Sequence, residues 1–152
     1  QWKDVKVMAN DSLVYDGIVS LIQGVLPNHV RLPDSYVVGG NDDLSLNQGF
    51  SVGFGGALNN KRTQCVKTST LRTFSLRFTK IAGAEHSEDA DLANEQKALI
   101  DEAFLVYDEL RKTNTLNGIT VNIDYESDSG IEFSEDLQHM IINAEVSAEY
   151  FE

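Results

Sequence analysis

Cysteine, proline, cationic residues and long apolar runs are all scarce in this chain of 152 residues. Cys65 is the single cysteine, which excludes an internal disulfide framework and a zinc site built from several thiolates. No apolar run approaches the ~18 residues that a transmembrane helix requires, so no membrane association is expected. Lys and Arg total 12 against 24 Asp and Glu, which gives a net charge of −12. Such an acidic chain is poorly suited to gripping nucleic-acid phosphates.

The remaining composition is that of an ordinary soluble globular protein, with 41% hydrophobic and 24% charged residues. The length suits one domain, residues 1–152, with a core of its own. The charge is unevenly distributed, because the middle of the chain is basic and residues 85–152 are mostly acidic. The basic residues of the middle are Lys61, Arg62, Lys67, Arg72, Arg77 and Lys80. This asymmetry suits solubility or electrostatic pairing between copies of the chain.

Two stretches have the periodicity of amphipathic helices. The first covers about residues 11–25, where Asp11-Ser12 provides an N-cap signal and Leu26-Pro27-Asn28 a stop. The second covers about residues 89–112, with acids in its first turns and Arg111-Lys112 at its end, as the helix dipole favours. Its apolar stripe is expected to include Leu92, Leu99, Ala103, Val106 and Leu110, widened by Ile100, Phe104 and Tyr107.

Four stretches alternate like half-buried strands: residues 50–54, 73–79, 119–125 and 141–150. We expect Phe74, Leu76 and Phe78 to face the core. Gly55 to Lys61 is expected to be a flexible connection, and Glu126 to Gly130 a polar loop. Residues 39–62 as a whole are interpreted as a flexible loop or a β-hairpin arm.

These elements predict an α+β fold. A small, mostly antiparallel or mixed sheet carries an N-terminal helix and one long amphipathic helix, with a Gly-rich loop or hairpin arm added.

The acidic stretch from Asp124 to Glu135 offers candidate ligands for a metal ion. Acids at its first, third, fifth, ninth and twelfth positions, with isoleucine at the eighth, match the spacing of a calcium loop. The candidate ligands are Asp124, Glu126, Asp128 and Glu135, and Glu132 is the acid at the ninth position. Gly130 is the seventh residue, whereas the loop needs glycine at the sixth, and a strand-like stretch precedes it where the motif needs a helix. The same residues also fit an acidic hairpin loop without a cation.

No motif in the sequence indicates catalysis or a cofactor. Gly53-Phe54-Gly55-Gly56 lacks the Lys-Ser/Thr pair and the following helix of a phosphate loop. No G-x-S-x-G elbow occurs, and the three histidines lack the spacing of metal ligands. We therefore predict no catalytic residues, no cofactor and no enzyme.

The order of elements resembles the tail terminator proteins of long-tailed bacteriophages. The resemblance covers an N-terminal helix, a β-rich region ending in Phe78-Thr79-Lys80-Ile81, an acidic linker and the long helix. It continues through a segment with Asp124-Tyr125 to a last strand ending in Glu149-Tyr150. The Gly-rich stretch at 39–62 departs from that layout.

The resemblance implies a non-enzymatic virion protein assembled in the host cytoplasm. Members form a hexameric ring that ends polymerisation of the tail tube and joins tail to head. Its partners would be copies of itself, the tail tube protein and a head-completion protein, while DNA passes through the lumen without specific binding. Two alternatives remain at this point: another head–tail connector or tail tube component of the same particle, and a calcium-binding acidic interaction module.

Overall fold

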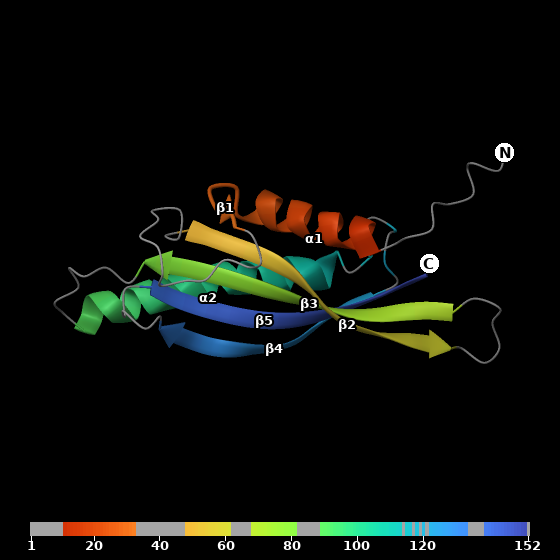
Figure 1. Cartoon of the computed structure of the whole chain (residues 1–152). Helices are drawn as coiled ribbons and strands as arrows, with labels where there is room; N and C mark the ends of the chain where they lie inside the picture. Colours follow the sequence, from red (N-terminus) through yellow and green to blue (C-terminus); the bar gives the residue numbers. More distant parts are fainter. Residues whose placement is uncertain are drawn as a thin grey trace.

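The computed structural model describes residues 11–32, 48–61, 68–81, 89–113, 115–116, 118, 120, 122–133 and 139–151. Its elements follow in the order α1 (Asp11–Val25), β1 (Val30–Arg31), β2 (Gly49–Lys61), β3 (Thr68–Ile81), α2 (Asp89–Lys112), β4 (Asn122–Phe133) and β5 (His139–Phe151). Two helices and one mixed sheet confirm the predicted α+β class (Figure 1).

The strands form one five-stranded sheet in the order β1-β2-β3-β5-β4. Only the short β1 runs parallel to its neighbour, β2, while the other three pairings are antiparallel. β5 lies between β3 and β4, so the chain leaves β3, passes through α2 and returns two strands away. The last strand then fills the gap, which makes β3 and β5 the centre of the sheet.

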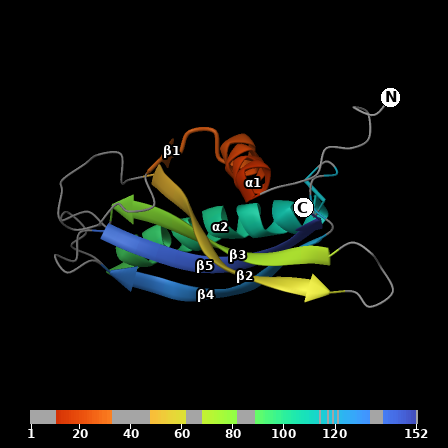
Figure 2. The same cartoon turned by 45° about the vertical axis from the view of Figure 1, so that its right-hand side comes forward.

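Both helices pack on one face of the sheet. α2 contacts β3, β4 and β5, and α1 contacts α2 and β2. Figure 2 shows α1 nearly end-on above the sheet and α2 running behind the strands. Alternate strand residues point into this layer, and the largest wholly buried ones are Tyr150, Phe50, Phe74, Phe78, Leu76 and Met140. Burial of these side chains supplies most of the driving force for folding.

The helix boundaries expected from the sequence are confirmed by α1 and α2. Leu99, Ala103, Val106 and Leu110 of α2 are buried as expected, and so is Tyr107. The expectation for Ile100 and Phe104 is wrong, because these side chains are 49% and 56% exposed. The sheet takes up only a narrow strip of the helix surface, so the flank of the stripe remains in solvent.

Two segments expected to be irregular are strands. Gly55 to Lys61 continues β2 in register with β3, past a bulge between Phe54 and Ala57. Glu126 to Gly130 belongs to β4, which accommodates its polar sequence with two bulges. Turn-forming residues mark bulges here because the neighbouring strand continues to offer hydrogen bonds on either side of them.

The expected core positions of the other strands fit the structure where it describes them. Phe74, Leu76 and Phe78 are buried, as are alternate residues of β5 from Ile142 to Tyr150. Cys65, Glu135 and residues 39–47 lie outside the described residues.

Candidate functional site

A polar cluster ties the start of α1 to the middle of β3 and the end of β5. Arg72 of β3 donates from Nε and Nη2 to the two carboxylate oxygens of Asp11, at 3.1 and 3.0 Å. The hydroxyl of Tyr150 donates to the same carboxylate. Arg72 also donates from Nη1 to the carbonyl of Gly55 at 2.8 Å, which fixes the bulge of β2. Four separate elements are therefore locked together at one guanidinium.

The electrostatics of this cluster favour an ionised Asp11. The hydrogen bond from Tyr150, and then the contact with Arg72, lower the pKa of Asp11 below its ordinary value of 3.8. Burial, together with the hydrogen bond to Asp11, raises the pKa of Tyr150 to about 12. The carboxylate and the guanidinium therefore stay charged, and the phenol stays neutral, at neutral pH. We call the three residues Asp11, Arg72 and Tyr150 the clamp.

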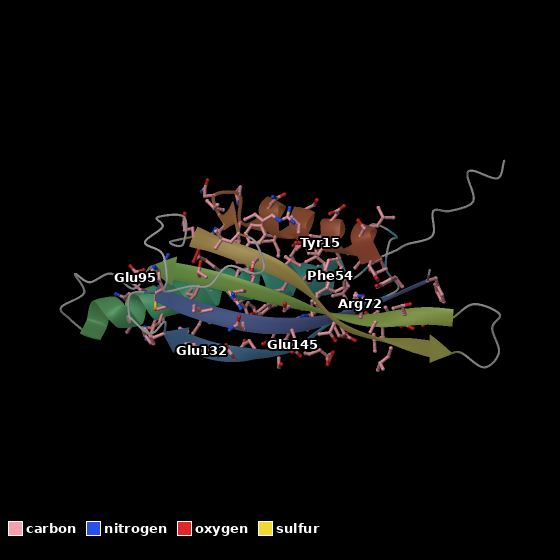
Figure 3. All side chains as sticks on the ribbon, viewed as in Figure 1. Tyr15, Phe54, Arg72, Glu95, Glu132 and Glu145 are labelled. Atoms are coloured by element: carbon pink, nitrogen blue, oxygen red, sulfur yellow. The ribbon has the colours of Figure 1, made fainter. Side chains whose placement is uncertain are left out.

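A row of stacked side chains continues from the clamp along α1 (Figure 3). The ring of Phe54 lies 4.8 Å from that of Tyr15, nearly parallel to it, and Arg72 lies over the other end of the row at 6.0 Å from Phe54. Arg31 lies 5.4 Å from the Tyr15 ring and donates to its hydroxyl at 2.8 Å. Cations over aromatic faces are attractive, so the row holds β2 against α1 although Phe54 is 53% exposed.

A second ionic cluster joins the loop after α1 to α2 and β3. His29 Nε2 lies 2.9 Å from Glu102 Oε2, and Lys80 Nζ lies 3.7 Å from Glu102 Oε1. Burial tends to raise the pKa of Glu102, but the hydrogen bond with His29 and the charge of Lys80 outweigh it and lower that pKa. The carboxylate therefore serves as a structural tie between three segments.

The three described calcium candidates are not brought together. Asp124 and Glu126 lie on the face of the sheet away from the helices, where they accept hydrogen bonds from Asn122 and Ser147. Asp128 lies on the helix face and accepts from Tyr125 at 2.6 Å and from the Gly130 amide at 2.9 Å. An extended backbone over 122–133 differs from the tight loop that calcium needs. The calcium interpretation loses its geometric support.

The described segments contain no group of three or more His, Cys, Asp or Glu residues arranged to hold a metal ion. No helix among them is long and apolar enough to cross a membrane.

An apolar groove of about 330 Å³ lies between α2 and β4. Its apolar lining comprises Ile100, Ala103, Phe104, Tyr107, Tyr125 and Ile142. Arg111 and Asp128 line it as well, so charged groups of both signs are present. Phe104 is 56% and Tyr125 42% exposed, which is unusual for aromatic side chains in contact with a core.

Two tyrosines of the groove stack on each other, and one of them packs against the core. The rings of Tyr107 and Tyr125 stack with centroids 4.3 Å apart, and Tyr107 packs edge-on against Phe78 of the core. Burial, with the hydrogen bond to Asp128, raises the pKa of Tyr125 to about 12, and burial also raises the pKa of Tyr107. Both phenols are neutral at physiological pH. The Tyr107 hydroxyl is buried and has no hydrogen-bond partner in the described part of the chain.

The face of the sheet away from the helices is acidic. Strand register and hydrogen bonding place five carboxylates on it: Asp124, Glu126, Glu132, Glu145 and Glu149. Glu132 and Glu145 are labelled beside β4 and β5 in Figure 3. Among the described strand residues, Arg77 is the basic residue on this face, and it donates a hydrogen bond to Asn143 at 2.9 Å.

Sequence reasoning missed both the clamp and the groove. Asp11 was recognised as a helix-start residue and Arg72 as part of a basic stretch, but nothing in the sequence joins two residues 61 positions apart. A signal for the groove did exist: Ile100 and Phe104 lie to one side of the stripe formed by Leu99, Ala103, Val106 and Leu110. A helix with an apolar surface wider than its sheet contact presents the excess to another partner.

The fold has a counterpart among solved structures. No family model matches the sequence, and no curated protein matches it. In all, 26 chains of solved structures match it, and one of them is described as "Virion of native gene transfer agent (GTA) particle". Its TM-score is 0.56 at 13% identity, covering 95% of this chain and 96% of that chain. At this identity the likeness shows a shared fold over nearly the whole length of both chains.

Proposed function

We propose that this chain is a non-enzymatic structural protein of a phage-like virion, and specifically the tail terminator. The likeness to a chain of a gene transfer agent virion carries the proposal, because it spans 95% of this chain and 96% of the other. The order of helices and strands supports the finer role, since it resembles the layout of tail terminator proteins.

In this role, six copies form a ring at the head-proximal end of the tail tube. The ring ends tube polymerisation and presents its other surface to a head-completion protein. Assembly takes place in the host cytoplasm, and the ring remains in the finished virion. The clamp around Arg72 and the ion pairs at Glu102 suit a structural subunit, because their role is to hold the helices on the sheet.

The acidic face of the sheet suits a wall along which DNA moves. Five carboxylates on that face repel the phosphates of a passing duplex, and the one cation that the described strand residues place there offers little to retain it. A lumen that does not bind DNA leaves the genome free to move through the ring in either direction.

The runner-up is another component of the same particle, a head–tail connector or the tube subunit itself. The two differ in how they assemble, because a tube subunit polymerises with itself and a terminator stops at one ring. The second alternative, a calcium-responsive module, would give heat on calcium addition in calorimetry.

The decisive experiment grows tail tubes from the tube protein of the same particle, with and without this chain, and measures them in negative-stain electron micrographs. A terminator gives a ring at one end of each tube and arrests further growth. Long tubes formed by this chain alone would instead identify it as the tube subunit. A chain that stays monomeric at high concentration and leaves tube growth unchanged contradicts the proposal.

A further inference from the structure

The β2–β3 hairpin differs in charge from the rest of the chain. Residues 56–72, from the outer ends of the two strands and the sequence between them, carry four of the 12 Lys and Arg residues and none of the 24 Asp and Glu residues. Of these four, Arg72 is bound to Asp11, and Lys61, Arg62 and Lys67 are the other three. The paired ends of these strands extend past the N-terminal end of α1 (Figure 1). We call this extension, residues 56–61 of β2 with 68–72 of β3, the arm. On it Leu58 is 69% exposed, the largest value among the exposed large hydrophobic side chains described.

The arm is held in a fixed direction. Arg72 anchors it to Asp11 and to the Gly55 carbonyl, and Leu58 lies opposite Leu71 in the strand register. A preorganised arm loses little conformational entropy when it docks, so an exposed apolar residue at its surface is well placed for a contact.

The α2–β4 groove has the complementary character. It is apolar, two of its tyrosines stack on each other, and Asp128 and Arg111 are its charged lining residues. The rest of α2 adds acidic residues near it, among them Asp101 and Asp108. β4 next to it is the outer strand of the sheet, at the side opposite β1 and β2. The two bulges of β4 interrupt its outer edge, which disfavours simple addition of another strand there and leaves side-chain docking into the groove.

We infer that the α2–β4 groove of one copy takes the arm of a second copy, with Leu58 entering beside Phe104 and Tyr125. The basic hairpin then lies against the acidic α2–β4 side of its neighbour. Groove and arm are different surfaces at opposite sides of one sheet, so the contact is head-to-tail. Repetition of such a contact closes into a ring when its rotation allows. This inference rests on the proposed assembly of identical copies and names the surfaces that carry it.

Cysteine cross-linking of the full chain tests the contact directly. In a Cys65→Ser background, one preparation carries Leu58→Cys and a second carries Phe104→Cys, and both are oxidised separately and as a mixture. A disulfide-linked dimer formed only in the mixture is the expected result. A dimer from the Phe104→Cys preparation alone would mean that groove meets groove, which overturns the inference. No cross-link in the mixture overturns it too, whether or not the unmodified chain oligomerises.

A matched pair of substitutions on α2 gives the energetic test. Phe104→Asp places a charge in the groove and should weaken self-association at least about tenfold, as loss of a buried aromatic anchor does. Leu105→Asp is the control, because Leu105 is 53% exposed on the next helix position and does not line the groove. Equal self-association of the two variants in sedimentation velocity overturns the inference.

The tube-growth experiment separates this inference from the proposed function. If the Phe104→Asp variant still caps tubes as a ring, the terminator role stands and the assignment of the groove fails. If neither the variant nor the unmodified chain affects tube growth, the terminator role itself fails.

Discussion

Substitution of Gly55 by alanine is expected to destabilise the chain, whereas the same change at Gly56 is not. A Cβ at Gly55 would lie 2.8 Å from the backbone oxygen of Thr73, on the strand that pairs with β2. Relief of that clash requires the two strands to separate beside the hydrogen bond from Arg72 to the Gly55 carbonyl. A Cβ at Gly56 would meet nothing within 4 Å. The two neighbouring glycines therefore form a matched pair.

The magnitude follows from two opposing effects. Overpacking against fixed backbone costs about 1–3 kcal/mol, and replacing a strand glycine by alanine returns about 0.5–1 kcal/mol. The net loss for Gly55→Ala is about 1 kcal/mol at the middle of these ranges, which lowers the melting temperature of a domain of this size by about 2–4 °C. Gly56→Ala should raise it by about 1–4 °C, because only the unfolded chain loses freedom.

Thermal unfolding followed by circular dichroism, with both variants and the unmodified chain at one concentration, measures the difference. Equal melting temperatures for the two variants would refute the close approach of β2 and β3 at the bulge. A Gly55→Ala variant more stable than the unmodified chain would refute it more strongly.

Three further predictions concern α2, the clamp and the groove. Leu99→Ala should cost about 2–5 kcal/mol in chemical denaturation because Leu99 is wholly buried, whereas Leu105→Ala should change stability by less than about 0.5 kcal/mol. Asp11→Asn should be less stable than the unmodified chain at neutral pH. Because the folded-state pKa of Asp11 is lowered, its contribution is present above the ordinary value of 3.8 and is lost as the pH falls below it, so the two unfolding curves converge in acid. Asp128→Asn should lower the pKa of Tyr125 from about 12, since the acceptor and its negative charge are removed; an unchanged NMR titration of the Tyr125 ring would contradict the contact.

The apolar periodicity predicted both helices well, because the apolar residues of each helix form its contact with the rest of the protein. The bounds of α1 and α2 follow from caps and apolar spacing, and burial of Leu99 and Val106 follows from the same stripe. Periodicity does not say how wide the interface is. Phe104 continues the apolar stripe in the sequence, yet its side chain is exposed to solvent. The width of the helix–sheet contact depends on which strands lie under the helix, and the helix sequence does not contain that information.

The strand lengths were harder to predict for a related reason. Glycine is typical of turns, which is why Gly55 and Gly130 predicted breaks in the strands. In the structure both glycines lie at bulges, within β2 and β4 respectively. Gly130 has a φ of 72°, which a bulge and a turn both accommodate. Whether such a residue ends a strand depends on the register of its partner, and register is set by residues far away in the sequence.

The candidate sites show the same limit. The acids from Asp124 to Asp128 have ligand-like spacing along the chain. Regular alternation would put Asp124 and Asp128 on one face, but the bulge between Tyr125 and Ser127 shifts the alternation by one residue and sends them to opposite faces of the sheet. The contact between Asp11 and Arg72 could not be foreseen, because it depends on how α1 crosses the sheet.

The mass of the assembly that this chain forms on tail tubes tests the central claim most directly. Tubes capped in the presence of the chain are washed free of excess protein. The capping assembly is then released intact, and its mass is measured by native mass spectrometry. The account predicts one closed species of six copies, about 100 kDa from the chain mass of 16.8 kDa. A continuous ladder of masses, as an open polymer gives, or a monomer that never remains with the tubes, would contradict it.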